Sequence, residues 1–217
     1  MSGLLAREIE KLEHLILNQS ACVENLLMQA EQAVADRDGD LASRIINSRD
    51  DVCRVQVDIE EECLKVLALH QPVAQDLRLI VAVLKINDRL ECIGDLAVGI
   101  ARRAKMLSAG RRVEFPYDFS DMAQTARGML HDSMDALVSL DTQLCRKVCV
   151  ADDEIDGINR RIQRRAQKDM AENPKNVGEL INLLGVSRRL ELAADQAVNI
   201  AEDVIYLVER EIMRRKP

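Results

Sequence analysis

The sequence predicts an all-α protein made of two tandem three-helix bundles, each an up-down-up repeat. Three observations lead to this fold class. Ala, Leu, Glu, Arg and Asp dominate the 217 residues, while Trp is absent and only two Tyr and two Phe occur, a composition typical of helical bundles. Apolar residues recur at alternating gaps of three and four, as along the packed face of a helix. One such stretch is also repeated 100 residues later, which indicates a duplication.

The repeated stretch spans residues 86–107 and 186–207. Its apolar positions in the first copy are Ile86, Leu90, Ile93, Ala97, Ile100, Ala104 and Leu107, and in the second Val186, Leu190, Ala193, Ala197, Ile200, Val204 and Leu207. Each copy also carries a Glu and an Asp four residues apart, at Glu91 and Asp95 and at Glu191 and Asp195. In the heptad these carboxylates fall outside the apolar stripe. One face is therefore predicted to build the bundle, and the other to present an acidic pair.

Three helices are predicted in the first half. The first carries apolar residues from Leu5 to Ala30 and ends at the turn 36–40, where Gly39 is available for a positive φ. The second runs from about Leu41 to Leu69, with a polar interruption near residues 47–51, and Pro72 ends it. The third, from about Val73 to Leu107, is predicted to be about 50 Å long.

The second half repeats this plan after a linker at residues 108–119, which holds both phenylalanines, Phe115 and Phe119. We expect these aromatic residues to pin the linker to the bundle surface. The predicted domains are residues 1–110 and 115–217. The second helix of each half aligns at a shift of 103 residues, and the shift drops to 100 beyond residues 172–175, as a short deletion in a loop would cause. The last helix is expected to run on through Arg214.

Charge and cysteine content narrow the function classes. The net charge of −7 argues against nonspecific binding to nucleic acid, and the basic runs at residues 102–103, 160–165 and 214–216 are expected to be solvated helix faces or ends. None of the six cysteines forms a CxxC pair, so we expect them to be small core or semi-buried residues in a reducing cytosol. A signal peptide and an apolar run of about 20 residues are both missing from the sequence, so a cytoplasmic protein is expected.

The two acidic pairs are the candidate functional sites. Residues four apart are neighbours on a helix, so Glu91 with Asp95, and Glu191 with Asp195, each offer four oxygens on one patch. Carboxylates about 5 Å apart repel by roughly 3 kcal/mol at an effective dielectric constant near 20, and a hard cation would reverse this repulsion. We therefore expect a divalent or trivalent metal ion. Oxygen ligands suit magnesium, manganese or calcium and can hold iron, and zinc is a further candidate.

The surroundings of the two pairs differ in the sequence, so two unlike sites are expected. Asp88 extends the first patch by one turn, where the second copy has Arg188, and the second copy has Asn199, Glu202 and Asp203 further along. A second helix must complete the coordination. The candidates for it are Asp50, Asp51, Asp132, Asp135 and Asp153, with His131 as the nearest imidazole. Arg89 and Arg189, which repeat beside the motif, are predicted to form surface salt bridges or to contact a partner.

Two segments resemble the signature segments of the PhoU family: HQPVAQDLRLIVAVLKINDRLECIGDLAVGIA at residues 70–101 and RRLELAADQAVNIAEDV at residues 188–204. The resemblance extends over essentially the whole chain. It implies a cytoplasmic regulator of phosphate uptake with metal sites built on an E(D)xxxD motif. It also implies that the protein restrains phosphate-starvation signalling through the ATPase subunit of a phosphate ABC transporter and a phosphate-sensing histidine kinase. Membrane association would occur only through these partners, and a homodimer is expected.

Two other function classes compete with this interpretation. A di-iron enzyme would need Glu-x-x-His motifs, but the residues three before the histidines are Lys11, Leu67 and Gly128. The sequence also contains neither a GxxxxGK[ST] loop nor a GxSxG elbow, so we expect no enzymatic activity. The alternative is a metal-free helical scaffold or adaptor that docks partner proteins through charged helix faces. The double Glu-x-x-x-Asp favours the metal-binding regulator, because a scaffold does not require it.

Overall fold

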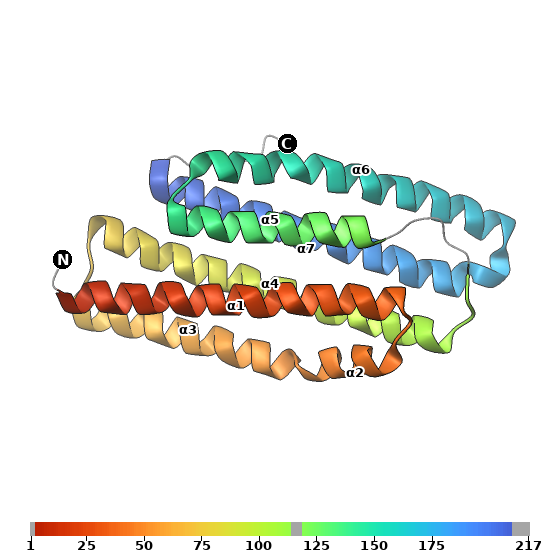
Figure 1. Cartoon of the computed structure of the whole chain (residues 1–217), viewed down its shortest axis with the longest axis horizontal. Helices are drawn as coiled ribbons and strands as arrows, with labels where there is room; N and C mark the ends of the chain where they lie inside the picture. The colour runs from red at the N-terminus through yellow and green to blue at the C-terminus, as the bar shows by residue number, and fades with distance from the viewer. Residues whose placement is uncertain (1–2, 114–118, 210–217) are drawn as a thin grey trace.

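The computed structural model describes residues 3–113 and 119–209, and this part of the chain is almost entirely helical (Figure 1). Its elements are α1 (Gly3–Ala35), α2 (Gly39–Asn47), α3 (Arg49–His70), α4 (Ala74–Ala109), α5 (Phe119–Ser139), α6 (Thr142–Glu172), the 3-10 turn η1 (Pro174–Asn176) and α7 (Val177–Glu209). The described residues contain no strand. The predicted all-α class is therefore confirmed.

The first half consists of α1, the broken pair α2 and α3, and α4. The predicted second helix is divided at Ser48, within the polar interruption. The Ser48 backbone N–H donates to the carbonyls of Arg44 and Ile45, which ends α2, and α3 starts at the next residue. Gln71 ends α3 with a left-handed φ of 44°, directly before Pro72. The interruption near residues 47–51 and the stop at Pro72 are both confirmed.

The turns after α1 and α5 are built alike. Each has a non-glycine residue with a φ of 54°, Arg37 in the first and Leu140 in the second. An aspartate follows at the helix N-cap, where Asp38 and Asp141 accept hydrogen bonds from the backbone N–H groups two and three residues ahead. The expected positive φ at Gly39 is wrong, because Gly39 is already the first residue of α2. The positive φ of this turn lies two residues earlier, at Arg37.

The second half consists of α5, α6, η1 and α7. Phe119 is buried at the start of α5, whereas Phe115 and the predicted continuation of the last helix to Arg214 fall outside the described residues. α6 ends at Glu172, and Pro174 opens the 3-10 turn that leads into α7. The connection between α6 and α7, where the repeat shift changes, is thus a single turn of 3-10 helix.

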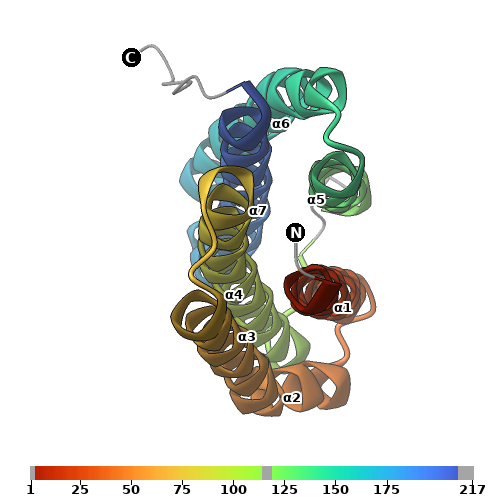
Figure 2. The ribbon, with the colours of Figure 1, turned by 90° about the vertical axis from the view of Figure 1, so that its left-hand side faces the viewer.

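The two halves share one core. Figure 2 shows α3, α4, α7 and α6 in a curved layer, with α1 and α5 together on one side of it. α4 packs against α7 and α1 packs against α5, so both contacts join the halves. All fourteen apolar positions of the repeated stretch are buried, and they belong to a single cluster with residues from both halves. The predicted seam is confirmed, and it extends across the middle of the molecule.

The structure also bears on the expected burial of the cysteines and on membrane-spanning helices. All six cysteines are free thiols; Cys63 and Cys145 are fully buried, and burial raises the pKa of each to about 12. Cys22 is exposed, so the expected core position does not hold for it. Within residues 3–113 and 119–209, we find no helix with the length and apolar character needed to cross a bilayer.

Candidate functional site

The first acidic pair lies on α4 opposite the start of α3, where an arginine faces it. Arg49 Nε is 2.7 Å from Asp95 Oδ1, and Arg49 Nη2 is 2.9 Å from Asp95 Oδ2. The same guanidinium reaches to 3.9 Å from Glu91 Oε1, and Cys53 donates from Sγ to that oxygen at 3.6 Å. A two-pronged arginine contact already supplies positive charge to this pair. One of the two negative charges of the first pair is therefore balanced within the chain.

The second acidic pair lies on α7 in different surroundings. Glu191 is 7% exposed; its Oε1 pairs with Arg188 one turn earlier, and its Oε2 is buried without a hydrogen-bond donor. Burial raises the pKa of Glu191; Arg188 opposes this, while the carboxylates of Asp195, Asp156 and Asp152 add to the rise. A buried carboxylate that faces other carboxylates carries a desolvation cost that a cation would remove.

The sequence analysis missed Asp152 and Asp156, the two α6 residues that face Glu191. Under the shift of 103 residues that aligns the second helices, they correspond to Arg49 and Cys53. The two halves therefore place opposite chemistry at equivalent positions: a cation and a thiol beside the first pair, and two carboxylates beside the second. The repeat identifies both aspartates only once the structure has placed Arg49 and Cys53 beside the first pair.

Four other acidic candidates are not brought into these sites. Asp88 is exposed and accepts a hydrogen bond from Gln56 at 3.4 Å, and Asp51 pairs with Arg54 at 3.4 Å with its side chain 74% exposed. Asp153 is exposed, whereas its neighbour Asp152 faces Glu191. Asp50 is exposed as well. On α6, Asp152 and Asp156 act on Glu191, and the expected Asp153 does not.

The candidates on α5 belong to another surface. His131 Nδ1 is 3.7 Å from Glu24 Oε2 on α1, and His131 Nε2 is 3.6 Å from Asp135 Oδ2. This cluster therefore lies where α1 meets α5 and does not approach either acidic pair. Asp132 is half-buried on α5, and within the described residues it forms no hydrogen bond or ion pair with either acidic pair. Of these residues, His131 joins the two halves through Glu24.

Asn199 and Asp203 face the N-terminal part of α4. Lys85 Nζ is 2.8 Å from Asp203 Oδ1, and Arg89 Nη1 donates to Gln196 Oε1 at 3.5 Å. Asn199 and Asp203 line a cavity of about 370 Å³ together with both α4 cations. Across residues 3–113 and 119–209, no group of three His, Cys, Asp or Glu side chains is arranged as a metal site. Arg89 thus contacts α7 within the chain.

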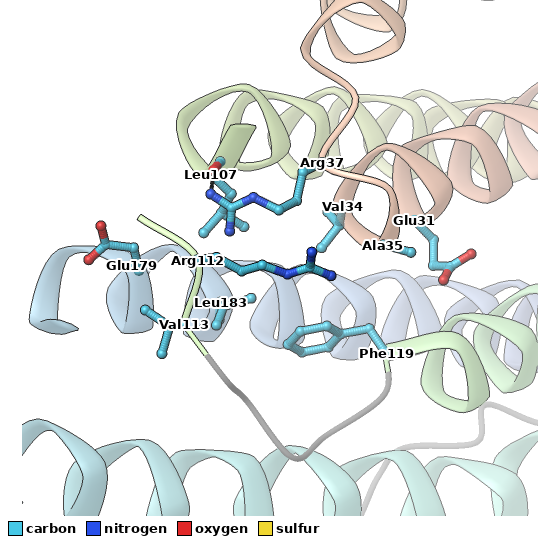
Figure 3. Close-up of a pocket in the computed structure, with 10 residues that line it drawn as sticks. All are labelled: Glu31, Val34, Ala35, Arg37, Leu107, Arg112, Val113, Phe119, Glu179 and Leu183. Atoms are coloured by element: carbon cyan, nitrogen blue, oxygen red, sulfur yellow. Dashed lines mark hydrogen bonds between the residues drawn. The ribbon is translucent and has the colours of Figure 1, made fainter. Parts of the chain in front are cut away.

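A smaller cavity, of about 200 Å³, lies at the other end of the bundle (Figure 3). Arg37 and Arg112 line it with residues of α1, α4, α5 and α7. Arg37 Nη2 donates to the carbonyls of Leu107 and Gly110, the latter at 2.8 Å, at the C-terminal end of α4. These bonds hold the Arg37 side chain on α4. The guanidinium serves as a cap of α4, which the sequence did not reveal.

Comparison with known proteins places both halves in one family. A sequence model described as the PhoU domain matches residues 16–104 and again residues 119–204. The chain belongs to the PhoU family. The two PhoU domains fall on α1–α4 and α5–α7, so the family unit is the three-helix repeat, and the resemblance seen in the sequence is confirmed.

Individual PhoU relatives cover nearly all of the chain. It is 32% identical over 212 residues to the phosphate-specific transport system accessory protein PhoU homolog of Aquifex aeolicus, covering 98% of this chain and 96% of the relative. The crystal structure of PhoU from Pseudomonas aeruginosa matches with a TM-score of 0.88 at 32% identity, over 95% of this chain and 99% of that one. A PhoU structure from Streptococcus pneumoniae, at 24% identity, shares the fold with a TM-score of 0.90 over 97% of this chain and 99% of that one. These relatives are named as accessory or regulatory proteins and not as enzymes, in agreement with the expected absence of enzymatic activity.

Proposed function

We propose that this protein is a regulator of phosphate transport. The observation that carries the proposal is the match of two PhoU domains over both halves, together with full-length relatives named as phosphate-specific transport accessory proteins. In the finer form of the proposal, the protein acts in the cytoplasm, as a homodimer. There it restrains the ATPase subunit of a phosphate ABC transporter and a phosphate-sensing histidine kinase.

Deletion of the gene from the cells that make the protein tests this role. In phosphate-rich medium, deletion should raise phosphate uptake and switch on genes of the starvation response, and the wild-type gene should reverse both effects. Purified protein should also retain the transporter ATPase subunit and the kinase on an affinity column. Unchanged uptake and gene expression in the deletion strain would refute the regulatory role.

The metal part of the proposal is confined to the second half. The first pair does not fit a metal, because Arg49 already occupies the face of Asp95 with two close contacts. The second offers a suitable donor set, because the charges of Asp195, Asp156 and Asp152 act on Glu191, whose Oε2 is buried without a donor. These carboxylates are not gathered into a metal site in this structure, so a bound ion would have to draw them together. Iron, manganese, magnesium or zinc would be held by these carboxylates once Arg188 releases Glu191. Such an ion would fix α6 against α7 and so shape the surface offered to partners.

Metal content and thermal unfolding test this assignment. After dialysis against manganese or ferric iron and then buffer, wild-type protein should retain metal and unfold at a higher temperature. The double variant Glu191→Gln with Asp195→Asn should lose both effects. Its matched control, Glu91→Gln with Asp95→Asn, should keep them. Equal metal loss in both variants would contradict the confinement to the second half, and no metal in the wild type would leave a scaffold that docks partners without an ion.

A further inference from the structure

The crossing of α4 and α7 has two ends that the sequence repeat relates to each other. Each α4 residue from Leu77 onward has a counterpart 100 positions later on α7, so a contact at one end predicts a contact at the other with the roles of the helices exchanged. Lys85 contacts Asp203 at one end, and correspondingly Arg103 lies over Gly185 at the other. Figures 1 and 2 show the two helices side by side through the middle of the molecule. The backbone of the crossing is symmetric.

The charges at the two ends are unequal. At the first end Lys85 and Arg89 from α4 share a cavity with Glu202 and Asp203 from α7, so positive and negative charges balance. At the second end the counterparts of Glu202 and Asp203 are Arg102 and Arg103, and Arg189 takes the place of Arg89. The second end therefore brings three arginines together where the first has two cations and two carboxylates. This basic cluster consists of Arg102, Arg103 and Arg189.

Two guanidiniums of the basic cluster, those of Arg103 and Arg189, meet over Gly185. A methyl group on Gly185 would lie 3.0 Å from Arg103 Nε and 3.3 Å from Arg189 Nη1, so both side chains occupy the space over this residue. Arg189 also lies on Gly99, where an added methyl group would be 2.8 Å from its Cδ. Both glycines thus leave room for the two side chains. Burial lowers the pKa of Arg189, and the charges of Arg103 and Arg102 lower it further.

No carboxylate compensates this positive charge within the described ranges. Arg103 Nη1 donates to Asn182 Oδ1 at 3.0 Å, and Arg189 Nη1 donates to the Gly185 carbonyl at 2.8 Å. Both acceptors are neutral, and none of the three arginines forms an ion pair with any described residue, 3–113 or 119–209. Glu179, one turn before Asn182 on α7, instead accepts from the Arg111 backbone N–H at 3.1 Å. Most of the five N–H donors on each guanidinium remain available.

We propose that the basic cluster at this end of the α4–α7 crossing binds a phosphate group. A tetrahedral anion with several oxygens matches converging guanidiniums, which bind phosphate through paired N–H donors, and its charge offsets the three positive charges. Arg102 is exposed, and Arg103 and Arg189 are half-buried, so the anion reaches the cluster from solvent. Free phosphate and the phosphates of a nucleotide share this chemistry. The assignment adds a ligand to the proposed regulator, but it depends only on the described side chains.

Thermal unfolding and calorimetric titration of purified protein test the site, with inorganic phosphate and ATP as probes and sodium chloride at matched ionic strength as the baseline. Wild-type Tm should rise by about 3 °C at saturating probe. The variant Arg103→Asp recreates the carboxylate of the other end, at Asp203, and should lower affinity at least tenfold. A rise with inorganic phosphate identifies free phosphate as the ligand, and a rise with ATP alone identifies a nucleotide.

A matched control lies at the balanced end. Lys85→Gln removes a cation there and should leave the response to phosphate unchanged, even where it lowers Tm by breaking the pair with Asp203. Arg189→Gln provides a second loss-of-binding variant, with circular dichroism to verify that it folds. The proposal is overturned when wild type binds neither probe, or when Arg103→Asp binds as tightly as wild type. Neither result bears on the regulatory role, which the gene deletion tests separately.

Discussion

At the scale of single residues, the same side chain in two repeats has two different environments. Glu91 and Glu191 occupy equivalent positions, yet Glu91 meets Arg49 and Cys53, whereas Glu191 meets Asp152 and Asp156. The direction of a pKa shift depends on such neighbours and on burial. The motif alone therefore places both residues outside the apolar stripe, but it predicts neither the burial of Glu191 nor the direction of its pKa shift.

Glu191 and Glu62 have pKa values shifted in opposite directions, so their contributions to stability should change with pH in opposite directions. The pKa of Glu191 is raised chiefly by burial, so the folded protein holds more protons than the unfolded one between pH 4.5 and that higher value. Wild-type stability should therefore fall as pH rises through this window, and Glu191→Gln should abolish the fall. Urea unfolding in EDTA from pH 4 to pH 8 measures it. A stability difference between variant and wild type that stays constant with pH would contradict the prediction.

Glu62 provides the opposite case in the same experiment. Hydrogen bonds from Lys11, 2.9 Å away on α1, and from Lys65 lower its pKa, so its contribution is present above pH 4.5 and is lost as pH falls through the lowered value. Glu62→Gln should cost about 0.5–1 kcal/mol at pH 7 and progressively less toward pH 3. Glu61→Gln, an exposed neighbour, serves as the control and should change little at either pH.

At the scale of helices and turns, one arginine joins three elements. Arg37 follows α1, precedes α2 and donates to carbonyls at the end of α4. Arg37→Ala should destabilise the protein by about 1–2 kcal/mol, because the buried Leu107 carbonyl loses a charged donor while the strained φ remains. Leu140→Ala, at the equivalent turn, keeps the same φ without such a loss and should cost less. Urea unfolding of both variants tests the difference, and equal costs would contradict it.

The helices themselves could be predicted from the sequence more fully than their contacts. Pro72 and the polar residues around Ser48 mark helix ends by local chemistry, so the stop and the break were both predictable. Which partner an exposed residue meets depends instead on how a neighbouring helix is rotated. The contacts of Arg49 with Asp95, and of Arg37 with α4, depend on that rotation and left no local signal. Asp152 and Asp156 follow from the repeat only after the contacts of Arg49 and Cys53 are known.

At the scale of the whole molecule, the shared core should make the two halves unfold together. Ile93 is fully buried on α4, within the cluster that residues of α5 and α7 also join. Ile93→Ala should cost about 2–5 kcal/mol through lost packing and a cavity. Hydrogen exchange should then quicken in α6 as well as in α3, because both helices lose protection in one global transition. Faster exchange confined to the first half would show that the halves are independent units.

Because the two repeats are joined in one polypeptide, the two ends of the α4–α7 crossing can carry different charges. Two separate, identical chains related by a twofold axis would carry the same residue at both ends of their crossing. A mutation to arginine would then place like charges at both ends at once, and a mutation to aspartate would remove both anion sites. In a single chain Asp203 and Arg103 are independent codons. One end can therefore hold the helices together while the other binds a ligand. A symmetric dimer of identical chains could not separate these two roles.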